Sequence, residues 1–258
     1  VDLAFSPTLY IGEPIASVSI NVTNALETRA TNAGAVDSIY IDSVDSYTAL
    51  RAFYLESRRG FVGAGGDIGA PLADPLADPL ADHLPDTVFV APNAPSPCGV
   101  NPMGYQWFPI PWMDGSSEVE MGQGFAASAA KLNTYLDEVA AGEGIGPEKT
   151  VLVGFSQGTM ISLQVGPRRA ASVAGVVGFS GRLLHPGSLA AEAVTKPPVL
   201  LIHGDADEVV PYASMPEAET ALKGAGCSVE THTSPGTGHG IAPDGLGRAL
   251  AFIQSALA

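Results

Sequence analysis

Hydrophobic residues in most of this chain fall into two patterns, short apolar runs and longer segments with helical spacing. The short runs are typical of strands that are covered on both faces. They predict strands at residues 87–91, 151–153, 174–179 and 198–203, with a further strand at 228–233. The longer segments predict helices at 118–140, 159–163, 215–224 and 245–257. Because strands and helices alternate, the pattern predicts an α/β fold with a mostly parallel central sheet and helices on both faces.

The first sixty residues follow a different pattern. Polar and apolar residues alternate in Ser17–Thr23, which predicts a half-buried antiparallel strand, whereas 24–34 has the composition of a loop. Two further strand candidates lie at 38–41 and 52–55. We therefore divide the chain into an atypical N-terminal segment, 1–60, whose strands would add to the sheet, and a main α/β domain, 61–258.

A glycine-rich stretch, Phe61–Gly69, begins the main domain. It lacks the lysine of the GxxxxGK[ST] loop and does not match GxGxxG, so nucleotide binding is not expected. Two interpretations stay open, a loop in which a backbone N–H approaches a ligand and a plain turn. The sequence Pro-Leu-Ala-Asp then occurs three times in 71–82, which is too short for a solenoid.

Aromatic residues gather in the proline-containing stretch Gly104–Met113. Such residues are typical either of ordinary packing or of the wall of an apolar pocket, and the pattern leaves both interpretations open. The candidate wall residues in this stretch are Trp107, Phe108, Ile110 and Met113. If they form a wall, we expect Leu183 and Val209 to lie opposite.

Composition narrows the function classes. The formal net charge is −15, and no Lys or Arg lies between Arg59 and Lys131, which argues against nucleic acid and anionic membrane surfaces as partners. No run of about 18 apolar residues and no signal-like start occurs, so we expect a cytoplasmic protein without stable membrane insertion. The first residue is Val1 rather than Met, which leaves open whether the start of the chain has been trimmed. Cys98 and Cys227 show no metal spacing, which predicts free thiols, no metal and no cofactor.

The main chemical motif is Gly154-Phe-Ser-Gln-Gly158, between a predicted strand and a predicted helix. In a nucleophile elbow, a GxSxG serine sits at strained backbone angles, and side chains two residues away on either side would collide with the strand and the helix. The motif and its context predict that Ser156 is a nucleophile. The alternative is a glycine-rich turn that merely contains a serine.

A serine hydroxyl needs a base to take its proton and a carboxylate to orient that base. In α/β hydrolases the order along the chain is serine, acid, histidine, each on a loop at the carboxyl end of a strand. The loop after 198–203 offers three acids, Asp205, Asp207 and Glu208. The loop after 228–233 offers His239 between glycines as the base, while the other four histidines, His203 among them, are expected to be structural.

These motifs resemble the carboxylesterase/phospholipase branch of the α/β hydrolases, which includes bacterial carboxylesterases and acyl-protein thioesterases. The matching segments are Phe89–Pro95 with Pro97-Cys98, Gln106–Pro109, Gly154–Gly158, His203–Pro211 and Gly238–Gly240, within roughly 62–257. The resemblance implies that the acid is Asp207, with Asp205 in support. It also implies an oxyanion hole made by the backbone N–H groups of Gln157 and Gly65. The family's His-Gly-x-Gly loop aligns with Gly63–Gly66, where the histidine is missing.

Taken together, these observations predict a serine carboxylesterase that hydrolyses short- to medium-chain neutral esters through an acyl-enzyme intermediate. The absence of Lys and Arg between Arg59 and Lys131 favours a neutral small-molecule ester, and the absence of a separate lid domain favours shorter chains. One alternative is an acyl-protein thioesterase or lysophospholipase with the same triad. Another is a catalytically silent hydrolase-fold binding protein. The resemblance also allows a homodimer.

Overall fold

The structure is a computed structural model that contains two compact units. It describes residues 19–22, 26–29, 80, 83, 84, 87, 89, 90, 92, 94–98 and 105–258. The smaller unit contains the strands β1 and β2, and all later elements belong to the larger unit.

The smaller unit contains one antiparallel pair, β1 (Ser19–Val22) and β2 (Leu26–Arg29), in which Ser19 pairs with Arg29. The strand predicted at 17–23 is confirmed, but the loop predicted at 24–34 is wrong where β2 forms. A hairpin partner supplies backbone N–H and C=O groups, so a polar segment beside a strand can pair without apolar alternation. The candidates at 38–41 and 52–55 lie outside the described residues.

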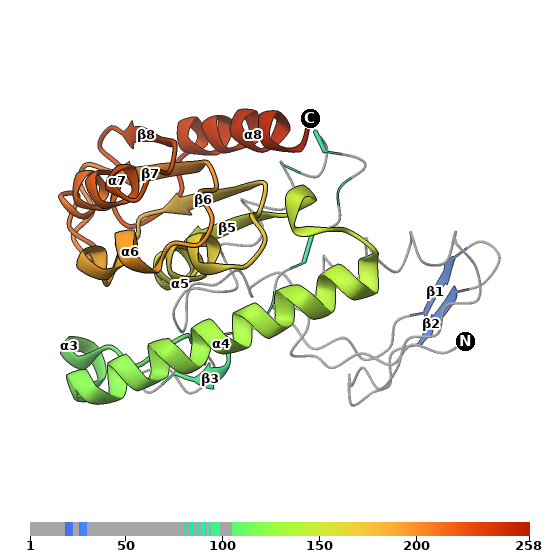
Figure 1. The fold of residues 1–258 in the computed structure, drawn as a ribbon. Helices are drawn as coiled ribbons and strands as arrows, with labels where there is room; N and C mark the ends of the chain where they lie inside the picture. The colour runs from blue at the N-terminus through green and yellow to red at the C-terminus, as the bar shows by residue number, and fades with distance from the viewer. Residues whose placement is uncertain are drawn as a thin grey trace. The chain divides into compact units, whose positions relative to one another are not determined.

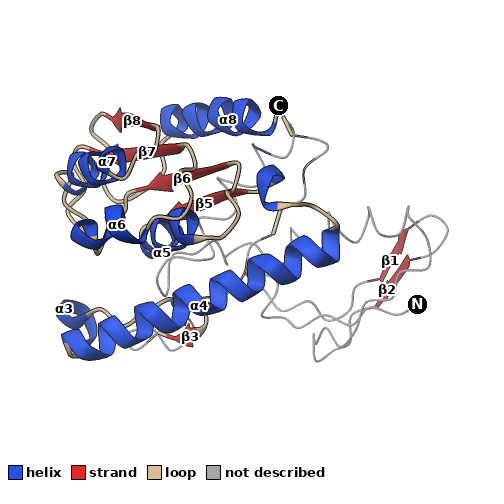
Figure 2. Cartoon of the chain, in the orientation of Figure 1, coloured by secondary structure: helices blue, strands red, loops and turns tan. Residues whose placement is uncertain are grey.

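The larger unit is built on a parallel four-stranded sheet in the order β5-β6-β7-β8 (Figures 1 and 2). The strands are β5 (Val151–Phe155), β6 (Gly175–Phe179), β7 (Val199–Gly204) and β8 (Val229–Ser234). Every residue of β6 and β7 is buried, as their apolar runs predict, whereas β8 at the edge is half exposed and more polar. This edge position explains why its apolar signal is weak.

The strand expected at 87–91 is not seen at its three described residues, Thr87, Phe89 and Val90. An apolar run indicates burial, but a strand also needs a neighbour to share its hydrogen bonds. Within the described part of the chain, β5 pairs only with β6. The described sheet therefore ends at β5.

Helices cover both faces of the sheet (Figures 1 and 2). One face packs against α8 (Pro243–Leu257), and the other against α5 (Gln157–Val165) and α7 (Ser214–Gly224). The other elements that the described residues of this unit form are α3 (Pro111–Asp114), α4 (Glu118–Glu143), α6 (Pro186–Glu192), η2 (Pro147–Lys149), η3 (Gly166–Arg168) and the strand pair β3 (Ser96–Pro97) and β4 (Tyr105–Gln106). The predicted α/β fold with helices on both faces of a parallel sheet is thus confirmed.

The long helix α4 packs on α5 and forms a second apolar cluster with it. α4 begins at a capping box in which Ser117 Oγ accepts the Glu120 N–H and Glu120 accepts the Ser117 N–H. Phe125 of α4 meets Phe108 edge to face, with ring centroids 5.2 Å apart. This cluster holds the Trp107–Phe108 segment against the helix that follows Ser156.

Candidate active site

Ser156 occupies the tight turn between β5 and α5. Its backbone angles, φ 53° and ψ −116°, are strained for a residue with a Cβ atom. A Cβ atom at Gly154 would lie 2.4 Å from the Gly158 carbonyl carbon, so strand and helix meet backbone to backbone. The Ser156 N–H donates to the Phe179 carbonyl at 2.9 Å and fixes the turn to the neighbouring strand. The turn has the geometry expected for a nucleophile elbow.

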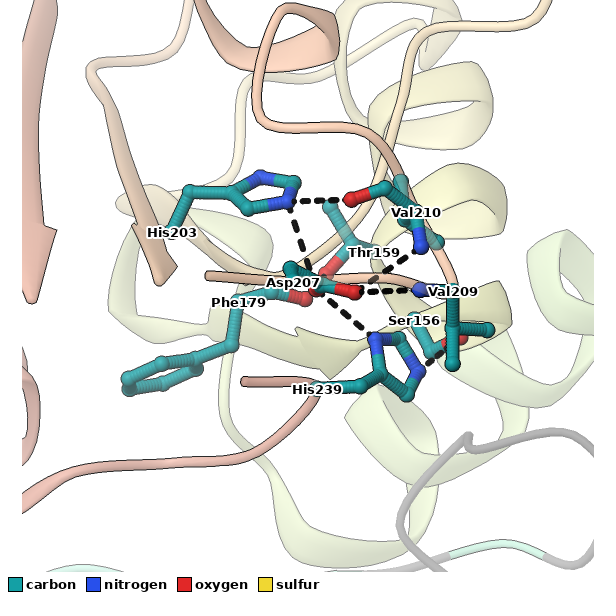
Figure 3. Close-up of polar contacts among 8 residues, drawn as sticks. All are labelled: Ser156, Thr159, Phe179, His203, Asp207, Val209, Val210 and His239. Atoms are coloured by element: carbon teal, nitrogen blue, oxygen red, sulfur yellow. Dashed lines mark hydrogen bonds and ion pairs between the residues drawn. The ribbon is translucent and has the colours of Figure 1, made fainter. Parts of the chain in front are cut away.

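Three of the predicted site residues, Ser156, His239 and Asp207, meet at the carboxyl ends of β5, β8 and β7 (Figure 3). His239 Nε2 lies 3.1 Å from Ser156 Oγ, and His239 Nδ1 lies 2.8 Å from Asp207 Oδ2. The His239 ring also packs on Phe155, with ring centroids 4.8 Å apart. An imidazole held in this way can take the serine proton through Nε2 while the carboxylate fixes the hydrogen on Nδ1.

Asp207 is buried and surrounded by N–H groups. Its Oδ1 accepts the backbone N–H groups of Val209 and Val210, each at 2.9 Å. Burial raises the pKa of Asp207, but hydrogen bonds from His239 and from the Val210 and Val209 N–H groups outweigh it and leave that pKa below its ordinary value. The carboxylate therefore stays ionised at neutral pH and can stabilise a positively charged His239 ring.

The two other acids of this loop point elsewhere. Asp205 Oδ1 accepts the Gly236 N–H at 2.6 Å, which ties the loop after β7 to the loop that carries His239. Glu208 is exposed. Of the three acids that the residue pattern leaves open, Asp207 is the one within hydrogen-bond distance of His239.

His203, expected to be structural, lies against Asp207 on the side away from Ser156 (Figure 3). Its Nε2 is 2.9 Å from the Val210 carbonyl oxygen and 3.3 Å from Asp207 Oδ2. The sequence contains one signal for this contact, since His203 stands four residues before Asp207 at the end of a buried strand. Sequence reasoning missed it because the tight turn between the two residues is not encoded by an apolar pattern.

Gln157 is buried and acts through its backbone and its side chain. As the first residue of α5, its backbone N–H has no carbonyl partner within the helix. Its side-chain Oε1 accepts the Trp107 N–H at 2.9 Å, and its Nε2 donates to the Phe108 carbonyl at 2.8 Å. The side chain thus clamps the aromatic segment to the elbow. The other predicted oxyanion donor, Gly65, lies outside the described residues.

The six predicted pocket residues differ in exposure. Trp107, Phe108 and Leu183 are buried in the apolar clusters, Ile110 is partly exposed, and Met113 and Val209 are exposed. A cavity of about 440 Å³ beside α4 is lined by Trp107 and by none of the other five. Their role as a pocket wall therefore stays a prediction.

Both cysteines, Cys98 and Cys227, are free, as predicted, and both are buried. Burial raises the pKa of the Cys227 thiol above its ordinary value, which keeps it protonated. Among the described residues, no group of three or more His, Cys, Asp or Glu side chains is placed to hold a metal ion.

Comparisons with known proteins bear on the family to which this chain belongs. Residues 66–257 match the model of the family described as phospholipase/carboxylesterase. Acyl-protein thioesterase 1 of Gibberella zeae is 32% identical over 182 residues, which cover 66% of this chain and 77% of that protein. Esterase YpfH of Escherichia coli is 31% identical over 160 residues, covering 61% and 65% of the two chains.

A solved structure gives the same result. The crystal structure of esterase PE8 superposes with a TM-score of 0.68 at 41% identity, over 77% of this chain and 89% of that one. The family match, these relatives and the parallel sheet agree with one another. The chain therefore belongs to the phospholipase/carboxylesterase family of the α/β hydrolases and is a carboxylic ester hydrolase.

Proposed function

We propose that this enzyme is a serine carboxylesterase in which Ser156 is the nucleophile, His239 the general base and Asp207 the acid. One observation carries the proposal. A continuous hydrogen-bonded chain runs from Ser156 Oγ through both nitrogens of His239 to Asp207 Oδ2, and it begins on a strained turn that leaves the serine partly exposed. This is the arrangement that acyl transfer requires.

The reaction has two halves. Ser156 Oγ attacks the ester carbonyl carbon while its proton passes to His239 Nε2, and the resulting oxyanion is stabilised by the Gln157 N–H, with Gly65 as the second predicted donor. The C–O bond to the alcohol then breaks, and His239 gives its proton to the departing alcohol. Water, deprotonated by His239, attacks the acyl-enzyme, releases the carboxylic acid and restores Ser156.

We assign short- to medium-chain neutral esters as substrates. Val209 is exposed and sits two residues from Asp207, where its backbone N–H binds the Asp207 carboxylate, so it offers apolar surface close to the reacting groups. The chain has no Lys or Arg between Arg59 and Lys131, which would leave an anionic acyl group without a cation from that part of the chain.

A series of p-nitrophenyl esters, from acetate to palmitate, tests the proposal on the wild type and Ser156→Ala. We expect hydrolysis to be fastest at short to medium chains, and Ser156→Ala to lose at least about 10⁴-fold in kcat. Ser188→Ala, on the surface helix α6, is the matched control and should keep full activity. A fluorophosphonate probe should label the wild type but not Ser156→Ala. A folded wild type that resists the probe would point to a catalytically silent binding protein.

A second candidate is thioester hydrolysis, including the removal of acyl groups from proteins. The 32% identity with the Gibberella zeae acyl-protein thioesterase 1 favours it. The same serine chemistry serves a thioester or a lysophospholipid, so the distinction depends on the acyl and leaving-group sites. Comparing kcat/KM for a palmitoylated cysteine peptide with that for medium-chain p-nitrophenyl esters decides between the two. A higher value for the peptide would replace the short-chain assignment.

Two further predictions concern the location and the oligomeric state of the protein. No described helix combines the length and the apolar character needed to pass through a bilayer. The cytoplasmic location stays a prediction, as does a homodimer. Light scattering coupled to size-exclusion chromatography measures the oligomeric state.

A further inference from the structure

We infer that His203 is a positioning residue for Asp207, and that it sets both the orientation of the carboxylate and the proton affinity of His239. The inference rests on the esterase activity proposed above. His203 comes from the end of β7, whereas Asp207 and His239 lie on the loops that follow β7 and β8.

The Asp207 carboxylate is surrounded by four N–H donors. Oδ1 receives the backbone N–H groups of Val209 and Val210, at 2.9 Å each. Oδ2 faces His239 Nδ1 at 2.8 Å and His203 Nε2 at 3.3 Å (Figure 3). A carboxylate offers about four lone-pair directions. The two backbone N–H groups bind Oδ1, so the groups that face Oδ2 are the rings of His239 and His203.

The hydrogen on His203 can be assigned from its neighbours. The Val210 carbonyl oxygen, 2.9 Å from His203 Nε2, can only accept a hydrogen bond, so Nε2 must carry the hydrogen. The same N–H lies 3.3 Å from Asp207 Oδ2. His203 is 2% exposed, so water does not compete for it, and the Tyr212 ring packs edge to face on its imidazole.

His203 also holds the loop that carries Asp207 in place. Val210 is held from two sides, since its N–H binds Asp207 Oδ1 and its carbonyl accepts from His203 Nε2. His203 lies on a strand whose six residues are all buried and which pairs with strands on both sides. The carboxylate is therefore linked through Val210 and His203 to a fully buried strand in the interior of the described sheet.

The contact also has an electrostatic consequence. The titratable side chains within ion-pair distance of Asp207 in the described part of the chain are His203 and His239, whereas the nearby Asp205 carboxylate binds the Gly236 N–H. The His203 N–H stabilises the negative charge on Oδ2 and so weakens its attraction for a proton on His239. Without it, Asp207 holds a protonated His239 more strongly, and the base loses its proton at a higher pH.

The test compares kcat/KM against pH for a short p-nitrophenyl ester in the wild type, His203→Leu and His203→Gln. Leu removes the donor, whereas a Gln amide nitrogen reaches about as far as Nε2. For His203→Leu we expect kcat to be about 10-fold lower than in the wild type and KM to stay within about threefold of it. The fall of kcat/KM on the acid side of the pH profile, its acid limb, should begin about 0.5 pH unit higher. His203→Gln should lie within about threefold of the wild type with an unshifted limb.

His232→Leu is the matched control, because His232 on β8 contacts Asp244 at 2.7 Å rather than Asp207. Its acid limb should not move. A folded His203→Leu with the wild-type limb, or a His203→Gln no better than Leu, would overturn the inference.

A second measurement needs no folded variant. In the unaltered protein, ¹⁵N NMR of the histidine rings should show hydrogen on Nε2 of His203, and hydrogen on Nδ1 alone would overturn the inference. If the wild type hydrolyses no ester, the proposed function fails, and this ring measurement still tests His203 separately.

Discussion

The elbow and the two loops opposite it hold their residues by different means. At the elbow, Ser156 is fixed by close backbone contact, because the strand and helix on either side of it meet where Gly154 has no side chain. The loops that carry Asp207 and His239 are fixed by side-chain hydrogen bonds, such as the one from the Gly236 N–H to Asp205. Ser156 is thus positioned by a close backbone contact that an added side chain would block. Asp207 and His239 are positioned by hydrogen bonds that polar side chains make.

The elbow and the two loops are therefore sensitive to different kinds of substitution. Adding a single carbon atom disturbs a backbone contact, whereas removing a polar atom disturbs a hydrogen-bonded loop. Substitutions of the two kinds should therefore separate loss of folding from loss of catalysis.

Among substitutions that keep Ser156, the largest effect is expected for Asp207→Asn, which keeps the shape of the acid but removes its charge. An amide cannot stabilise a protonated His239, and its NH₂ group favours the wrong tautomer, so kcat should fall about 10³- to 10⁴-fold with little change in KM. Steady-state kinetics with a short ester measure this. Glu208→Gln, an exposed neighbour on the same loop, should retain activity. Equal losses in the two variants would mean that the loop, rather than its charge, matters.

Gly154→Ala probes the elbow. The added Cβ would lie 2.4 Å from backbone atoms of Gly158 and Thr159, so we expect the free energy of unfolding to fall by about 3 kcal/mol. Urea unfolding measures it. Gly122→Ala in α4, where a Cβ would meet nothing within 4 Å, should instead stabilise the protein by about 0.5–1 kcal/mol. An unchanged stability for Gly154→Ala would contradict the proposed backbone contact.

A smaller effect is expected for Asp205→Ala, which removes the link between the two loops. Losing the hydrogen bond to the Gly236 N–H should cost about 1 kcal/mol of stability and lower kcat about threefold, because His239 follows three residues later. Thermal unfolding and ester kinetics measure the two values. Asp205→Asn keeps an oxygen that can accept the Gly236 N–H. If this variant has the stability and kcat of the wild type, the hydrogen bond matters more than the charge.

The smallest effect concerns acid stability. The pKa of Asp207 is lowered in the folded protein from its ordinary 3.8, so its contribution to stability is present above about pH 4 and is lost as the pH falls through the lowered value. The wild type should therefore lose stability more steeply than Asp207→Asn below pH 4. Urea unfolding at several pH values measures the two slopes, and parallel slopes would show that Asp207 contributes nothing.

Much of the fold, together with Ser156 and His239 as candidate site residues, could be predicted from the residue pattern, because buried parallel strands are apolar runs and the elbow needs its glycines. The helix α6 and the strand β2 could not, since neither has a marked periodicity. Choosing among Asp205, Asp207 and Glu208 from spacing alone was also beyond reach, because neighbouring residues of a tight turn point in different directions. The resemblance favoured Asp207, and the His239 contact agrees with it.

The clamp formed by Gln157 has a consequence for changing the substrate range of this enzyme. Its side-chain amide binds the Trp107 N–H and the Phe108 carbonyl, which are backbone groups that every residue except proline can offer in full. Both side chains are buried in the cluster with Phe125, so a library should offer other large apolar residues at these two positions and exclude proline at position 107, which keeps both the cluster and the hydrogen bonds to Gln157. Randomising Gln157 itself would release the segment, so it should be held constant when variants are selected on new esters.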